Sequence, residues 1–422
     1  MKNKQAMALG ATSIIVIAAV VSLVYFQEPT PIEETEIPLA DDTNATASSV
    51  ISLVDALNDF SVAFYDTITE SDEGNVFFSP YSIFTALSMA YEGANGNTAA
   101  EMHDVLSIAQ HDDATLGSFG RLYNLLNQHQ QGYTVSTANA FWAHQDYEFL
   151  QSYLVLLRNF YLAEGHELDF AQNVEAAEII NTWIEDHTNN KIKDMIDPSV
   201  LSDMTKLVLT NAIYFKGLWD QQFDPENTYD ADFTLASNDT VTVDMMVSDS
   251  KNDRFNYTET DTLQLLKLYY QGRDLSMIIV LPKENNISWA TSAITTENLS
   301  AWNDAFYEQE LVVSLPKFTI ETKYTLNDVL AEMGIHDAFA PGIANFSGMD
   351  GTTNLFISKV IHQAFVEVNE EGTEAAAATA VIMELTAIME EYFTADHPFV
   401  FLIQHEETGA ILFMGTVMDP SA

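Results

Sequence analysis

Two kinds of hydrophobic pattern follow one another along this chain and limit the folds open to it. Apolar residues at helical spacing predict helices over residues 50–65, 81–90, 147–161 and 174–187. Later segments rich in β-branched and aromatic residues predict strands over 206–215, 275–281 and 311–320, and a hairpin formed by 399–403 and 410–417. Helices first, with a mainly antiparallel set of strands later, is the pattern of the α+β class.

The first 26 residues differ in character from the rest. Lys2 and Lys4 precede an uncharged, largely apolar run over 6–26, and about 20 such residues cross a hydrocarbon core of roughly 30 Å. Because positive residues stay inside, the rest of the chain would face outward. We favour an uncleaved signal anchor in residues 1–26 over a cleaved signal peptide, since the run exceeds the usual signal core of about 7–15 residues. The expected location is therefore extracellular, either membrane-anchored or secreted.

The next segment offers little that can pack. Residues 27–49 hold Pro29, Pro31, Pro38 and many acidic residues, a composition typical of an acidic, disordered tether. Neither a repeat nor an interdomain linker is evident after Val50. We therefore expect one folded domain over residues 50–422.

The charge of the chain excludes several classes of partner. It has 16 Lys and Arg against 62 Asp and Glu, a formal net charge of −46. Nucleic acids and sulfated polysaccharides are bound by clustered basic residues, and this sequence has no basic stripe beyond its first few residues. We expect no nucleic-acid partner. Since salt screens repulsion between like charges, the composition also predicts a protein adapted to a salt-rich, halophilic environment.

No pattern of catalytic or metal-binding residues stands out. Cysteine is absent, which excludes disulfides, thiolate metal sites and a cysteine nucleophile. The chain lacks GxSxG, HExxH and GxxxxGK motifs, and its ten histidines are scattered. The sequence therefore predicts neither an enzyme nor a bound cofactor or metal.

Five segments stand out by their motifs, order and spacing. They are 75–106 (NVFFSPYSIFTALSMAYEGANGNTAAEMHDVL), 210–223 (TNAIYFKGLWDQQF), 315–318 (LPKF), 361–379 (IHQAFVEVNEEGTEAAAAT) and 393–420 (FTADHPFVFLIQHEETGAILFMGTVMDP). Together they resemble hallmarks of the serpin family of serine protease inhibitors. The resemblance implies the serpin fold: three β-sheets, eight to nine helices and an exposed reactive loop, here at about 373–392. It also implies a suicide substrate whose cleaved loop inserts into the large sheet while it is still joined as an acyl ester to the protease serine. We expect a monomer.

The resemblance assigns a hinge to Glu370, Gly372, Thr373, Glu374, Ala375, Ala376, Ala377, Ala378 and Thr379. Alternate side chains of an inserting strand face inward and must be small or apolar. The odd-numbered residues from Thr373 onward satisfy this. The charged Glu374 and Glu384 are even-numbered and would face the other way. By intrinsic propensity alone the same segment predicts a helix. The main alternative function is that of a non-inhibitory serpin acting as a carrier, chaperone or storage protein, whose hinge usually carries bulky, charged or proline residues.

Two further groups of residues match the family's gates. Ser79, Ser82, Asn211 and His362 match the central shutter, where we expect the histidine and the asparagine to be hydrogen-bond partners. Trp219, Lys317 and Glu370 match the breach, the upper entry point, where a lysine–glutamate pair lies next to a tryptophan.

The scissile bond is expected near Leu385, Thr386 and Ala387. Counting from Gly372 favours Thr386 before the bond, and counting back from Pro398 favours Ala387. None of the three is basic, so we expect a subtilisin-like or elastase-like target protease rather than a trypsin-like one. In the stretch 118–131, which matches the polysaccharide-binding helix of some serpins, Arg121 is the only base, and we expect no heparin-like activator.

Overall fold

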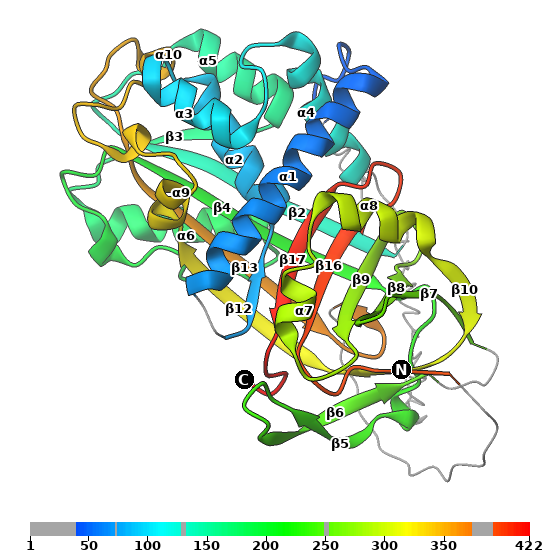
Figure 1. Ribbon diagram of the computed structural model, residues 1–422. Coiled ribbons are helices and arrows are strands. Elements are labelled where there is room, and N and C mark those ends of the chain that lie inside the picture. The colour runs from blue at the N-terminus through cyan, green and yellow to red at the C-terminus, as the bar shows by residue number, and fades with distance from the viewer. Residues whose placement is uncertain (1–38, 72–73, 128–131, 249–252, 374–390) are drawn as a thin grey trace, which may run out of the picture. The chain divides into compact units, whose positions relative to one another are not determined.

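The computed structural model describes residues 39–71, 74–127, 132–248, 253–373 and 391–422. The described residues form three β-sheets and ten α-helices in mixed order (Figure 1). The α+β class and the three sheets are thus confirmed. The number of helices exceeds eight to nine because α5, α7, α9 and α10 have six residues or fewer and are counted separately.

The sheet with the longest strands, called the large sheet from here on, has six strands in the order β12-β13-β14-β4-β2-β3. Its strands are β2 (Tyr133–His144), β3 (Glu164–Leu168), β4 (Leu207–Leu218), β12 (Phe318–Thr325), β13 (Ile357–Val368) and β14 (Gly372–Thr373). The strand expected over 311–320 is two strands, because β11 ends at Pro316 and β12, in another sheet, begins at Phe318.

The other two sheets come from the second half of the chain, apart from one short strand. The seven-stranded sheet consists of β1 (Val76–Phe78), β17 (Ile411–Val417), β16 (Phe399–His405), β9 (Leu275–Pro282), β8 (Leu263–Tyr269), β7 (Arg254–Glu259) and β10 (Tyr307–Glu310), in that order. The four-stranded sheet consists of β15 (Tyr392–Thr394), β11 (Val312–Pro316), β6 (Thr240–Val247) and β5 (Tyr229–Thr234). The predicted terminal hairpin is β16–β17.

Most helices come from the first half of the chain. The α-helices are α1 (Ala47–Ser71), α2 (Pro80–Glu92), α3 (Gly96–Leu106), α4 (Asp113–Leu126), α5 (Gln151–Leu156), α6 (Asn173–His187), α7 (Ile287–Thr291), α8 (Thr296–Ala305), α9 (Asn327–Glu332) and α10 (Ser347–Asp350). Three 3₁₀ turns are η2 (Pro198–Val200), η3 (Pro225–Asn227) and η4 (Asp337–Phe339). The helix expected over 147–161 begins only at Gln151 and ends as the π-helical turn η1 (Leu157–Tyr161).

Helix α2 lies at the centre of the domain. It packs against β17 of the seven-stranded sheet and against β4 and β2 of the large sheet. All thirteen of its residues are buried. An amphipathic surface helix buries one stripe only, so burial on every side explains the run of small and apolar residues in this segment.

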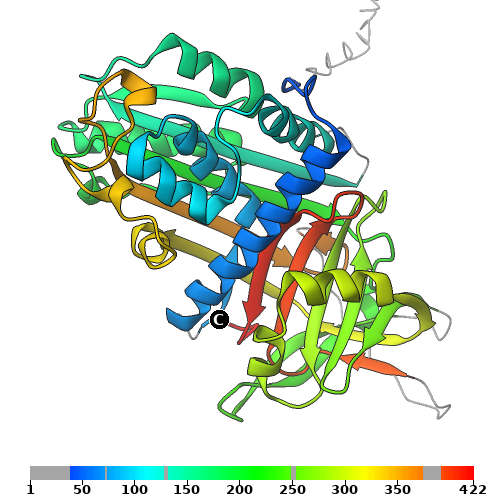
Figure 2. The same ribbon diagram turned by 45° about the horizontal axis from the view of Figure 1, so that its top comes forward.

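Helix α1 lies beside β17 in both views (Figures 1 and 2). Among the described residues it is the one helix long and apolar enough to cross a membrane. Its apolar stripe is nevertheless packed in the core, because Leu53, Leu57, Phe60 and Phe64 are each at most 2% exposed. α1 is therefore a core helix of the folded domain.

The large sheet is covered on its second face as well. Helix α6 packs on β2, and Ala176, Ile180 and Ile184 of α6 form a separate buried cluster with Trp142, Ala212 and Ile361 of the sheet. The middle of the sheet is therefore enclosed by apolar side chains on both faces.

The packed part of the domain begins earlier than residue 50. Ala40 is buried and exchanges two hydrogen bonds with the side-chain amide of Asn124, and α1 begins at Ala47. Residues 39–49, part of the expected tether, therefore pack on the domain. The sequence did not reveal this, because a single buried alanine and backbone hydrogen bonds leave no compositional signal. The expected anchor over 1–26, and residues 27–38, lie outside the described residues.

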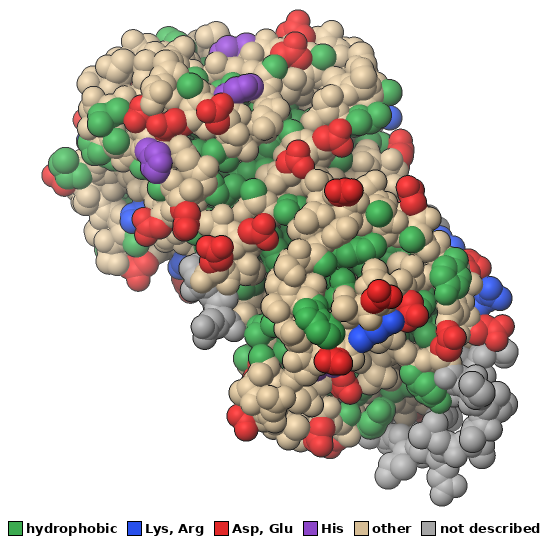
Figure 3. Space-filling model, in the orientation of Figure 1, with side chains coloured by type: hydrophobic (Ala, Val, Ile, Leu, Met, Phe, Trp, Pro, Cys, Tyr) green, Lys and Arg blue, Asp and Glu red, His purple; other side chains and the backbone are tan. Residues whose placement is uncertain are grey.

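Among the charged side chains visible in Figure 3, those of Asp and Glu are more frequent than those of Lys and Arg. Several of the bases are held in ion pairs with neighbouring acids, as Arg273 is with Asp220.

Candidate functional site: the gate of the large sheet

The gate is the seam between β13 and β4. These two strands run parallel and are paired from Ile357 opposite Leu207 to Phe365 opposite Tyr214 (Figure 1). Beyond that point β14 lies between them: Thr373 pairs antiparallel with Val368 of β13 and with Gly217 of β4. The large sheet is thus closed along most of the seam and already holds two residues of an additional strand at one end.

A tight turn feeds β14 into this gap. The Asn369 side-chain oxygen accepts hydrogen bonds from the backbone N–H groups of Glu371 and Gly372. A Cβ on Gly372 would lie 2.0 Å from the Gly217 carbonyl oxygen. Only glycine fits this close approach of two strands, which gives Gly372 of the predicted hinge a steric reason.

Two aromatic side chains hold Thr373 in place. Its hydroxyl shares a 2.9 Å hydrogen bond with the Tyr270 hydroxyl. Trp219 stacks on Tyr270 with ring centroids 4.6 Å apart, and its Nε1 donates to the Asn369 carbonyl at 3.0 Å. Burial raises the pKa of Tyr270 far above its ordinary value, so the phenol stays neutral and its hydrogen bond is retained at every physiological pH.

The breach residues form the expected ion pair. Lys317 Nζ lies 3.1 Å from Glu370 Oε2 and 3.2 Å from Oε1, and the Thr228 hydroxyl donates to Oε1 at 2.7 Å. The Glu370 side chain is 4% exposed and that of Lys317 27%. Exposed pairs contribute about 0–1 kcal/mol, but breaking this one would leave an enclosed carboxylate with only part of its partners.

The shutter residues meet at the start of α2. Ser79 is the N-cap: its hydroxyl accepts from Ser82 N and donates to the Leu412 carbonyl at 2.6 Å. The Ser79 backbone N–H donates to His362 Nε2 at 3.0 Å. Nε2 therefore carries a lone pair, and the neutral ring has its proton on Nδ1. Through these bonds α2 is linked to β13 of one sheet and to β17 of the other.

The expected hydrogen bond between the side chains of His362 and Asn211 stays a prediction. Asn211 lies opposite His362 in the ladder, but its side chain lies outside the described residues. His362 Nε2 accepts from the backbone N–H of Ser79, the N-cap of α2, and this bond does not test the pairing with Asn211. Glu374, Ala375, Ala376, Ala377, Ala378, Thr379, Leu385, Thr386 and Ala387 also lie outside the described residues.

Three residues of the gate were not predicted: Thr228, Tyr270 and Asn369. Each acts through a contact between distant segments; the Tyr270–Thr373 hydrogen bond joins residues 103 positions apart. No local periodicity marks such residues, although the adjacent Asn369 and Glu370, ahead of a glycine, carry a turn signal.

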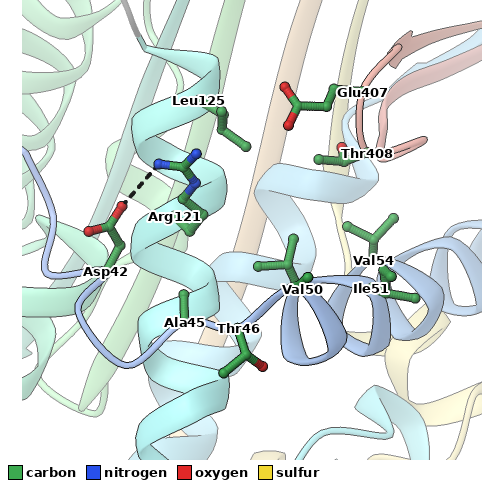
Figure 4. A pocket seen from close by; sticks show the side chains of 11 residues that line it. Asp42, Ala45, Thr46, Val50, Ile51, Val54, Arg121, Leu125, Glu407 and Thr408 are labelled. Carbon is green, nitrogen blue, oxygen red and sulfur yellow. Dashed lines mark hydrogen bonds and ion pairs between the residues drawn. The ribbon is translucent and has the colours of Figure 1, made fainter.

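A hollow lies away from the gate, between α1, α4 and the β16–β17 turn (Figure 4). It has a volume of about 550 Å³ and is lined on one side by Val50 and Ile51 of α1. Arg121 of α4 points toward Asp42, with 3.4 Å between nitrogen and oxygen, and Glu407 lies on the opposite rim. With its one base already paired, the site offers a sulfated chain little; the expectation of no heparin-like activator stays a prediction.

A family model described as serpin (serine protease inhibitor) matches residues 55–420. The chain belongs to the serpin family. This serpin is 42% identical, over 374 residues, to an uncharacterized serpin-like protein of Thermococcus kodakarensis, covering 87% of this chain and 86% of that one. It is 41% identical to leukocyte elastase inhibitor A of Mus musculus, in a match that covers 86% of this chain and 97% of that protein. Serpin48 of the insect Tenebrio molitor, a solved structure, has a TM-score of 0.77 and 32% identity, covering 87% and 98%.

Proposed function

We propose that this serpin inhibits serine proteases as a suicide substrate, by inserting its cleaved loop into the seam between β13 and β4. The observation that carries the proposal is β14, whose two residues already lie in that seam as an antiparallel strand. The serine oxygen of the protease would attack the scissile carbonyl, and the acyl ester would form as the peptide bond breaks and its amine leaves. This cleavage would free the chain that follows Thr373 to continue along the same path. The parallel pairing of β13 with β4 would then be replaced by pairing of both strands with the new one.

The register of β14 fixes where each inserted residue would go. Thr373 pairs with Gly217 and Val368, so six residues further along the antiparallel ladder Thr379 would lie between Asn211 and His362. These two are already opposite each other in the closed seam. Thr379 would therefore enter at the shutter, and β13 would have to separate from β4 there. The hydrogen bond from Ser79 to His362 would have to break or follow that movement.

Both faces of the large sheet are covered, which explains why the hinge has alanine at odd-numbered and at even-numbered positions. Ala378 would lie between Ala212 and Gln363, and Ala212 belongs to the cluster beneath α6. Small side chains are thus needed at this depth on both faces, not only on the inward one. Nearer the entry, Glu374 would lie opposite the exposed Lys216, where a charge is tolerated.

The target class follows from the loop sequence. Leu385, Thr386 and Ala387 are uncharged and small to medium in size, which suits the pockets of elastase-like and subtilisin-like proteases. The 41% identity to a protein named leukocyte elastase inhibitor supports the elastase-like arm of this proposal.

The test is incubation with subtilisin and with elastase, followed by denaturing gel electrophoresis. An adduct at the summed mass that survives boiling in detergent, together with a higher melting temperature of the cleaved form, is expected. Thr379→Arg would bury a charge at the shutter and should turn the inhibitor into a substrate. The matched control Glu374→Arg, facing Lys216 at the solvent side, should keep most of the adduct. Cleavage with neither adduct nor gain in heat stability would refute inhibition and favour a carrier or storage role.

We also propose that residues 1–26 hold the domain on the outer face of a membrane. Lys2 and Lys4 ahead of an apolar run support this orientation. The full chain should stay in the membrane fraction at alkaline pH and be degraded by protease added to intact cells. A chain lacking residues 2–26 should be soluble. Release of the full chain by alkali, or a mature N-terminus near residue 27, would contradict the anchor.

A further inference from the structure

A cavity of about 220 Å³, open to solvent at Glu164 and His187, lies between α2 and α6, apart from the gate residues. Five elements build its wall: α2, α4, η1 with the residue after it, β3 and α6. Its lining is mostly aromatic: Tyr81, Phe119, Tyr123, Phe160, Tyr161 and Trp183. This size suits a ligand of about ten non-hydrogen atoms, well below the usual 300–1,000 Å³ of drug-sized sites.

The one carboxylate in the lining is at the mouth of the cavity. The Glu164 side chain is 59% exposed, and Trp183 Nε1 donates to its Oε2 at 3.2 Å, which orients the carboxylate. Among the described residues that line the cavity, none is lysine or arginine. Burial raises the pKa of both Tyr81 and Tyr123, so their phenols remain neutral. The cavity therefore presents aromatic rings, the imidazole of His187 stacked on Trp183, and the Glu164 carboxylate, whose Oε2 also lies 3.3 Å from His166 Nε2.

The local backbone is unusual at this point. α5 passes into the π-helical turn η1 (Leu157–Tyr161), and Leu162 follows in the left-handed conformation with φ of 47°. A left-handed branched residue is strained, and π turns and strained residues concentrate at functional sites. Here the two irregularities bring Phe160, Tyr161 and Leu162, three successive residues, into one wall.

We propose that this cavity binds a small organic cation that carries a methylated ammonium group, with the aromatic rings around the methyl groups and Glu164 as counter-charge. Aromatic rings have a negative face and attract such cations most strongly where water is excluded. A strongly hydrated inorganic cation would gain little from the rings, and an anion would be repelled by Glu164. The cavity thus selects for positive charge combined with an apolar surface.

Binding would act on the gate through α2. Tyr81 in the first turn of α2 lines the cavity, while Ser79, two residues earlier, donates to His362 of the shutter. A ligand held between α2, α4, β3 and α6 would brace the start of α2 against movement. This consequence rests on the proposed inhibition by loop insertion; the binding itself does not.

The test is calorimetric titration of the full chain with choline, at constant chloride concentration. Its neutral isostere 3,3-dimethyl-1-butanol serves as the matched ligand, since only the charge differs. Choline should bind about tenfold more tightly than the isostere, and Glu164→Gln should remove most of that difference. Glu167→Gln is the matched control, because Glu167 is an exposed acid of the same strand outside the lining and its loss should change the affinity less than twofold.

Several results would overturn the proposal. They are equal affinity for choline and the isostere, equal weakening by Glu164→Gln and Glu167→Gln, and unchanged choline binding in Trp183→Leu. If Trp183→Leu fails to fold, the Glu164 pair still decides. Choline should also slow adduct formation with subtilisin at fixed ionic strength. If choline binds as stated and the rate does not change, the site stands and its link to the gate is wrong.

Discussion

Replacing Ser79 by alanine should weaken the native state by about 3 kcal/mol. The Ser79 hydroxyl caps α2 through Ser82 N, and loss of an N-cap costs about 0.5–2 kcal/mol. It also donates to the Leu412 carbonyl in an enclosed site, where a lost donor costs about 1–3 kcal/mol. For a domain of this size the sum corresponds to a fall of roughly 4 °C in melting temperature.

Ser88→Ala is the matched control in the same helix. Ser88 is as fully buried as Ser79, but its hydroxyl donates to the Phe84 carbonyl four residues earlier, an oxygen that the helix already uses. Its loss should cost less than about 1 kcal/mol. Each variant removes one buried hydroxyl; the Ser79 hydroxyl both caps α2 and ties it to β17, whereas the Ser88 hydroxyl does neither.

The measurement is thermal unfolding followed by near-ultraviolet circular dichroism, with the rate of adduct formation as the functional readout. Ser79→Ala should melt lower than Ser88→Ala and lose more of its inhibitory fraction, because the start of α2 no longer holds its place beside β13. If the two variants melt within about 1 °C of each other, the hydroxyl does not link α2 to β17 in the way described.

Four further outcomes are expected. Burial raises the pKa of Glu92 to about 7, so the native state binds this proton more tightly than the unfolded chain does, and stability is lost as the pH rises from about 4.5 to 7. Glu92→Gln should therefore raise the melting temperature more at pH 8 than at pH 5. Lys267 is 5% exposed and its Nζ lies 3.1 Å from both Glu406 oxygens, so Lys267→Met should cost about 3–5 kcal/mol in urea unfolding, and adding Glu406→Gln should recover part of it. Gly372→Ala should expel β14 from the seam, seen as faster proteolysis near the hinge. Melting temperature should rise with KCl concentration, because salt screens the repulsion of a −46 chain; a flat or falling curve would contradict this.

Local patterns in the sequence were enough for several of the elements and for the fold class. Helical spacing over 50–65 and 174–187 corresponds to α1 and α6, and the β-branched run over 206–215 lies within β4. These patterns can be recognised because the residues of one helix stripe or one strand face are only a few positions apart in the sequence. The family motifs added the three sheets and the positions of the gates, which periodicity alone could not provide.

Tertiary structure alone decided how the gate is held. The bond from Ser79 to His362 spans 283 positions and uses a backbone N–H, which no residue type reveals. The seam that β14 enters, the cover that α6 places over Ala212, and the packing of Ala40 likewise depend on which surfaces meet. Sequence determines which side chains can be buried or paired; only the folded chain brings distant groups within hydrogen-bonding distance and so selects their partners.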